Sequence, residues 1–238
     1  SLGGREIDDR KGLIAGNIGS LEAVRLINDG GRLISSGSLE GVIKEISNRE
    51  GMLTGAESVR IAGERLDNLR GQIGSYGSIG LDIDGIDNSS GYILSDGITR
   101  EEADSWAERK VREGTSDSSG AESSGDGIAI RADGLENVKG IIASLNRTEI
   151  IAGKITNRGG EIVSGGTVEV SVPGEYVYEG NVYGDISTRI EGKTVTVDEA
   201  VIRDNALYLI GKESINLGKD ITAGILGLET WVDINNRN

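Results

Sequence analysis

Apolar and polar positions along the chain recur with a period of about twenty residues. One phrase returns in every period, an apolar residue followed by Asn two positions later, Gly five later and Ile or Leu seven later. Its first copy is Leu26, Asn28, Gly31 and Leu33. The later copies place their asparagines at Asn48, Asn68, Asn88, Asn137 and Asn157. A fixed period of this length indicates a solenoid, in which one supersecondary unit is stacked on itself.

Within each repeat, apolar residues alternate with polar ones over short runs. Ile79, Leu81 and Ile83 are separated by Gly80 and Asp82, for example. This period of two, carried by β-branched and aliphatic residues, predicts strands with one buried face. We expect three short strands in each repeat, with the Asn and Gly positions turning the corners between them.

A unit of twenty residues is too short to close a hairpin domain and then repeat, but it matches one turn of a parallel β-helix. A single coil would bury too few apolar side chains to offset the backbone entropy that its ordering removes. Stacked coils supply the missing contacts, so stability is shared along the axis. The predicted fold is therefore all-β, a parallel β-helix of about 20-residue coils, regular over residues 1–172.

The six asparagines of the phrase are candidates for either a structural or a binding role. Asn tolerates left-handed corners, and its amide can accept from one neighbour and donate to the next in a stacked ladder. The alternative is that these side chains bind a ligand. A corner ladder is favoured because it explains all six positions at once. The glycines of the phrase have a similar interpretation, since Gly accepts a positive φ without strain.

One interval in the chain is longer than the others. Asn88 and Asn137 are 49 residues apart, which leaves 29 residues in excess of one coil. The alternation resumes at Ile128, so we place an insertion at residues 99–127 and expect it to leave the register of the coils intact. Its removal should therefore change the stability of the solenoid little.

The first half of the insertion carries the signals of an amphipathic helix. Thr99 and Glu102 form a capping box, and Ala103 and Trp106 share one helical face with Ala107 and Val111. The second half is rich in Ser, Gly and Asp and predicts a flexible loop. Trp106 is expected to dock the helix on the outer wall of the solenoid, with contact to a partner protein as the alternative.

The repeat phrase degrades after Val172. Pro173-Gly174 is predicted to break the strand that precedes it. Strand-like runs continue to the end of the sequence without strict register. We interpret residues 173–238 as irregular β coils that continue the solenoid, and a separate small β domain is the less favoured alternative.

Composition and charge exclude several functions. The net charge of −14, without a basic stripe, argues against nucleic-acid binding. No run approaches the roughly 20 apolar residues of a membrane span, so no membrane insertion is expected. The chain contains neither His nor Cys and thus lacks the usual general base, nucleophile pairs and soft metal ligands. We assign no catalytic residue, no cofactor and no metal. The chain begins with Ser, which suggests a segment of a longer protein.

Two features could still support chemistry, an acidic cluster and a possible cleft. Asp82, Asp84 and Asp87 match neither the EF-hand spacing nor the glycine-rich calcium nonapeptide, so a solvated surface role is favoured. Cleavage of a polysaccharide would need carboxylates held at a fixed separation in a groove. A polysaccharide-processing β-helix enzyme, a lyase or glycosidase, is the alternative function.

Three stretches of the chain, LINDGGRLISSGSL, LDNLRGQIGSYGSIGLDI and IDNSSGYILSDG, resemble the repeats of filamentous haemagglutinin-type exoproteins. That family includes adhesins exported by two-partner secretion and the stalks of contact-dependent growth-inhibition proteins. The resemblance covers about residues 7–172, apart from the insertion. It specifies the repeat architecture better than the individual member of the family.

The resemblance implies a right-handed parallel β-helix within a long fibre, secreted or held at the surface of a Gram-negative-type cell. The chain would be a shaft segment that serves cell adhesion or presents a distal effector. Its expected partners are the other coils of the parent fibre, and a receptor on a host or neighbouring cell.

Overall fold

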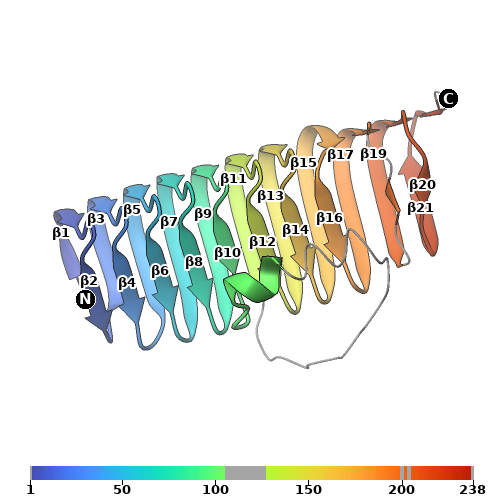
Figure 1. Ribbon diagram of the computed structural model, residues 1–238. Coiled ribbons are helices and arrows are strands. Elements are labelled where there is room, and N and C mark those ends of the chain that lie inside the picture. Colours follow the sequence, from blue (N-terminus) through green and yellow to red (C-terminus); the bar gives the residue numbers. More distant parts are fainter. Residues whose placement is uncertain (1, 105–126, 199–200, 203–204, 237–238) are drawn as a thin grey trace.

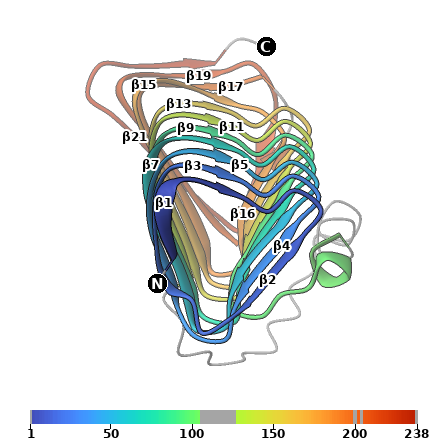
Figure 2. The ribbon, with the colours of Figure 1, turned by 90° about the vertical axis from the view of Figure 1, so that its left-hand side faces the viewer.

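The computed structural model describes residues 2–104, 127–198, 201–202 and 205–236. The fold is the predicted one, an all-β parallel solenoid of about ten coils. In Figure 1 the coils stand side by side from β1 near the N-terminus to β21 near the C-terminus. Figure 2 looks along the axis, where successive coils repeat nearly the same outline.

Two parallel sheets build the walls. The long sheet contains β1 (Leu2–Asp8), β3 (Gly19–Ile27), β5 (Leu39–Ser47), β7 (Ser58–Asp67), β9 (Ser78–Asp87), β11 (Ile128–Glu136), β13 (Arg147–Thr156), β15 (Thr167–Tyr178), β17 (Ser187–Val197), β19 (Ala206–Leu217), β21 (Ile225–Thr230) and β22 (Asp233–Asn236). The short sheet contains β2 (Leu13–Gly16), β4 (Arg32–Ser35), β6 (Met52–Gly55), β8 (Gln72–Ser75), β10 (Tyr92–Leu94), β12 (Ile141–Ser144), β14 (Glu161–Ser164) and β16 (Asn181–Gly184). A two-stranded sheet pairs β18 (Val201–Ile202) with β20 (Ile221–Thr222).

Each regular coil contributes one long and one short strand, which corrects the prediction of three separate strands. In β5, the segment that begins at Leu39 runs without a break into the segment that contains Ile46. The strand turns where two consecutive side chains, Lys44 and Glu45, both face solvent. The backbone is paired with the neighbouring coils on both sides of this bend and in one register, so two of the expected strands form one strand.

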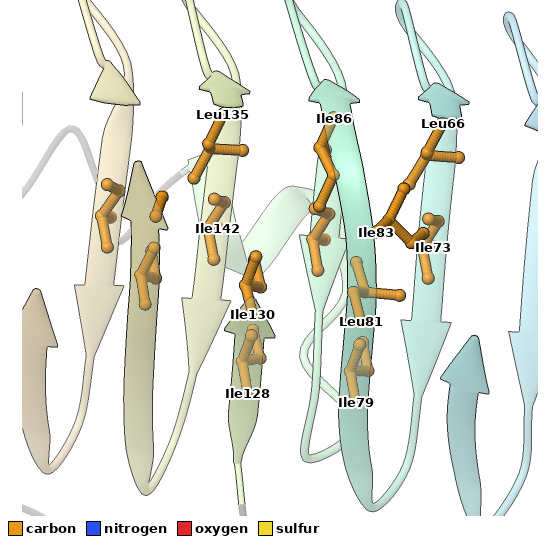
Figure 3. Close-up of a cluster of buried hydrophobic side chains, with 14 of the residues drawn as sticks. Leu66, Ile73, Ile79, Leu81, Ile83, Ile86, Ile128, Ile130, Leu135 and Ile142 are labelled. Carbon is orange, nitrogen blue, oxygen red and sulfur yellow. The ribbon is translucent and has the colours of Figure 1, made fainter. Parts of the chain in front are cut away.

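The core is a set of columns of like side chains. Leu33 pairs with Leu53, and Leu53 with Ile73, at steps of one coil, and all three side chains are fully buried. Figure 3 shows the buried apolar side chains of neighbouring coils, among them Ile79 and Leu81 of β9. The predicted vertical register is thus confirmed for these positions.

The insertion leaves the register intact, as predicted. Leu81 of β9 pairs directly with Ile130 of β11, although 49 residues separate them. The coil resumes at Gly127, whose carbonyl oxygen accepts a hydrogen bond of 2.9 Å from the Ile79 N–H. The described part of the insertion begins with a short helix at residues 100–104.

The prediction that Pro173-Gly174 breaks a strand is wrong. Both residues lie inside β15, where the pairing with β17 shifts register between Val172 and Glu175. A β-bulge tolerates Pro because its extra residue needs no ladder hydrogen bond. Beyond this point β17, β19 and β21 continue the same sheet in order.

Candidate functional site

The six predicted asparagines form one continuous buried ladder. Each Nδ2 except that of Asn157 donates to the Oδ1 of the next asparagine along the axis, and each of the six residues is at most 2% exposed. The five N···O distances are 2.7, 2.7, 2.7, 2.8 and 2.7 Å from Asn28 through Asn48, Asn68, Asn88 and Asn137 to Asn157. The second Nδ2 hydrogen reaches a backbone carbonyl, such as that of Met52 at 3.0 Å from Asn28. The ladder amides therefore bond mainly to one another and to the backbone, as expected for a structural corner ladder.

The glycines at the same corners have a different role from the one expected. The positive φ lies one residue earlier, for instance 55° at both Glu50 and Arg70. Gly51 is needed because a Cβ there would lie 2.1 Å from the Asn28 carbonyl oxygen of the preceding coil. Gly71 meets the Asn48 carbonyl at 2.0 Å in the same way. Close approach of stacked corners, rather than backbone conformation, selects glycine.

A second apolar cluster lies on the outer side of the short sheet, which we call the outer patch. Its buried members are Leu94, Ile98, Ala103, Ile141, Ala143, Val163 and Tyr183. Leu94, Ala143, Val163 and Tyr183 are register partners on four successive strands. They alternate with core residues, so they face away from the interior. The sequence predictions do not include this patch, and its one signal is a pair of adjacent apolar residues in each of β10, β12 and β14.

The short helix lies outside this wall, as Figure 2 shows. Its capping box is present, since the Thr99 N–H donates to Glu102 Oε2 at 2.9 Å and the Glu102 N–H donates to Thr99 Oγ1 at 3.3 Å. Ala103 is fully buried in the outer patch. The expectations for Trp106, the rest of the helical face and the flexible loop fall outside the described residues.

Polar contacts around Tyr92 fix the helix to β10. The Tyr92 hydroxyl donates to Asp104 Oδ1 at 2.9 Å, and the Arg100 guanidinium stands 4.1 Å from the centroid of the Tyr92 ring. Burial raises the pKa of Tyr92, and its hydrogen bond to Asp104 raises it further. The start of the insertion is thus held to the solenoid by apolar, hydrogen-bonding and cation–π contacts.

Charged groups are spread along the outer walls rather than gathered. Ion pairs join equivalent positions of adjacent coils, as in Arg25–Glu45 at 3.1 Å and Lys44–Glu64 at 2.9 Å. Among the described residues no group of three or more His, Cys, Asp or Glu could hold a metal ion. Within that same part of the chain, no helix is long and apolar enough to cross a membrane.

A shallow groove lies on the outer face of the long sheet. It has a volume of about 790 Å³ and crosses β3, β5, β7, β9 and β11. Small residues such as Ala62 and Gly80 line its floor, and Glu40, Arg60 and Asp82 line it with charge. Arg60 and Glu40 lie 3.6 Å apart and pair with each other.

The fold and these surfaces define a parallel β-solenoid repeat protein. Comparison with known proteins adds no relative, since no protein-family model, no curated protein and no solved structure matches the chain. Functional arguments therefore depend on the residues of the chain itself.

Proposed function

We propose that the chain is a non-catalytic shaft segment of a large secreted bacterial surface adhesin or exoprotein. It would serve cell adhesion or the presentation of a distal effector, with other coils of the parent fibre as its partners. The observation that carries the proposal is the unbroken pairing of eleven strands, β1 to β21, in one sheet along the axis. The resemblance to filamentous haemagglutinin-type repeats supports the same function.

A solenoid of this kind works as a stiff spacer. Coils spaced at about 4.8 Å give a rod of roughly 50 Å for ten coils. Each added coil extends the rod without a new fold, because each contacts only its neighbours. The start of the insertion is held on the outer patch, and the register of the coils is undisturbed. The insertion could contact a receptor on another cell from this position.

A length experiment tests the shaft proposal. Deletion of residues 48–87 removes two coils and brings Asn28 next to Asn88 in the ladder. The isolated chain should stay folded and shorten by about 10 Å, as measured by small-angle scattering. In cells that produce the parent protein, replacement of these coils by two others of equal length should preserve adhesion, whereas deletion should reduce reach. Loss of adhesion with the equal-length replacement would contradict a spacer role.

A polysaccharide-processing enzyme is the second candidate, favoured only by the groove on the long sheet. Its carboxylates Glu40 and Asp82 would be the acid and base groups, next to Arg60. Incubation of the purified chain with acidic and neutral polysaccharides, followed by measurement of new reducing ends and unsaturated products, tests this candidate. If a product forms and Glu40→Gln abolishes its formation, the enzyme proposal replaces the shaft proposal. If no substrate gives a product, the shaft proposal stands.

A further inference from the structure

The asparagine ladder begins with two acceptor oxygens that have no donor. Asn28 is fully buried, and its Oδ1 makes no hydrogen bond, although every later Oδ1 in the ladder accepts one from the preceding asparagine. Asp9, in the coil before, is only 8% exposed, and its Oδ2 is also buried without a partner. Two unsatisfied acceptors on consecutive coils are unfavourable unless a proton lies between them.

Asp9 occupies the ladder position that precedes Asn28. Its backbone N–H donates to the Ile27 carbonyl at 2.7 Å, as the Asn28 N–H donates to the Ser47 carbonyl at 2.7 Å. Its own carbonyl accepts from the Gly12 N–H at 2.9 Å, which repeats the bond from Gly31 to Asn28. The first coil therefore has the same corner as the others, with a carboxyl group in place of the amide.

A carboxylate in this place cannot do what an amide does. The amide Nδ2 of each ladder asparagine except the last donates to the next Oδ1, whereas an ionised carboxylate only accepts. A neutral carboxylic acid has one O–H to donate. We propose that Asp9 is protonated in the folded coil and donates to Asn28 Oδ1, so that a pH-sensitive hydrogen bond joins this coil to the next.

The surroundings of Asp9 favour the neutral form. Burial raises the pKa of Asp9, the backbone N–H of Ile14 lowers it, and the negative charge of Asp8 raises it. No described Lys or Arg forms an ion pair with Asp9, because Arg10 pairs with Asp8. Lys11 lies along Gly30 of the next coil, and Asp29 is bonded to Ser47.

The direction of the pH effect follows from the raised pKa. The stabilisation that a neutral Asp9 supplies is complete below the ordinary Asp pKa of about 3.9 and is lost as the pH rises through the folded-state pKa. The first coil should therefore open more often as the pH rises. Opening should increase by up to tenfold per pH unit between these two values.

Two measurements on the whole chain test the proposal. Carboxyl carbon NMR should give Asp9 a titration midpoint above that of Asp84, an exposed carboxylate on β9. Hydrogen exchange of residues 2–16, corrected for intrinsic rates, should accelerate with pH in the wild type. It should be slow and insensitive to pH in Asp9→Asn, which extends the ladder by one amide. Asp84→Asn should behave as the wild type.

A second variant places the same chemistry within the ladder. Asn48→Asp places a carboxyl group in the ladder position that precedes Asn68. The free energy of unfolding of this variant should rise as the pH falls toward 4, which is the same direction of pH dependence as expected for Asp9. The proposal is overturned by an Asp9 midpoint at or below that of Asp84. It is also overturned if Asp9→Asn exchanges like the wild type at neutral pH, or if protection depends on sodium or potassium, which would assign the gap to a cation.

Discussion

The rings of Tyr176 and Tyr178 meet edge to face in the core with centroids 6.4 Å apart, but their hydroxyls differ in hydrogen bonding. Tyr178 donates to the Val182 carbonyl at 2.9 Å, whereas the buried Tyr176 hydroxyl has no hydrogen-bond partner. The two residues fill the interior just beyond the last rung of the asparagine ladder, in the coil that contains the bulge at Pro173.

The inequality predicts opposite effects of removing each hydroxyl. Tyr176→Phe keeps the ring contact and removes an unsatisfied polar group, so the free energy of unfolding should rise by about 1 kcal/mol. Tyr178→Phe removes a formed hydrogen bond and should lower it by about 1 kcal/mol. Urea denaturation of the two variants, each the control for the other, measures the difference. Equal destabilisation would show that Tyr176 has a donor or acceptor partner after all.

Tyr176 also predicts a loss of stability at alkaline pH. Burial raises the pKa of Tyr176 above its ordinary value, and the nearby Tyr178 and Glu179 raise it further. The stabilisation is therefore complete below the unfolded pKa of about 10 and falls as the pH rises above it, because only the unfolded chain can release this proton. Denaturation midpoints between pH 9 and 11.5 should fall less steeply for Tyr176→Phe than for the wild type. Parallel curves would contradict the assignment.

The ladder predicts that an interior asparagine matters more than the first one. Asn68→Ala removes an acceptor for Asn48 and a donor for Asn88, and should lower the free energy of unfolding by about 2–4 kcal/mol. Above the folded-state pKa of Asp9, where Asp9 cannot donate, Asn28→Ala breaks only one side-chain bond of the ladder, the one to Asn48. Its effect should be smaller by about 1–2 kcal/mol. Thermal unfolding of both variants tests the order, and the reverse order would contradict it.

Strand facing predicts a large contrast between a position that faces the core and one that faces outward. Ile73 is fully buried in the core, and Ile73→Asp should destabilise the chain by about 4 kcal/mol or more through an unpaired buried charge. Val42 is 68% exposed, and Val42→Asp should change stability by less than about 0.5 kcal/mol. Circular dichroism melts measure both. A neutral Ile73→Asp would mean that its side chain does not face the core.

The outer patch changes what we expect from removing the insertion. Replacement of residues 99–127 by a short Gly/Ser turn should keep the strand signal, because the register does not depend on the insertion. It should also take Ala103 away from Leu94 and Ala143 and expose apolar area. The binding of a hydrophobic dye should therefore increase. Ala103→Asp should have the same local effect and speed trypsin cleavage after Arg100, whereas Glu101→Ala should not.

Much of the fold was predictable because the sequence repeats wherever coils stack. The equivalence of Leu33, Leu53 and Ile73 follows from the twenty-residue period of the sequence. The location of the insertion follows from the one interval that departs from this period. The fusion of two strands around Lys44 and Glu45 was not predictable. Two adjacent polar residues indicate a turn whether or not the backbone leaves the ladder, and only the neighbouring coils decide.

The parts of the site that sequence missed share a physical cause. Asp9 has the corner geometry of the ladder but a carboxyl group in place of the amide, so the Asn pattern in the sequence does not include it. The outer patch combines residues from four strands, none of which carries a long apolar run. The glycines were assigned to backbone conformation because a close approach such as that of Gly51 to Asn28 becomes visible only when two coils are superimposed.

All amide bonds of the ladder point the same way, from the lower-numbered asparagine to the higher. At its Asn28 end the ladder therefore turns an acceptor oxygen toward the coil of Asp9, and at its Asn157 end the Nδ2 hydrogens are given to the carbonyls of Gly160 and Glu179. The two ends of the ladder are therefore chemically distinct. Oxygen would meet oxygen if two such ladders were joined at their Asn28 ends, so coils can extend the ladder only in the same orientation.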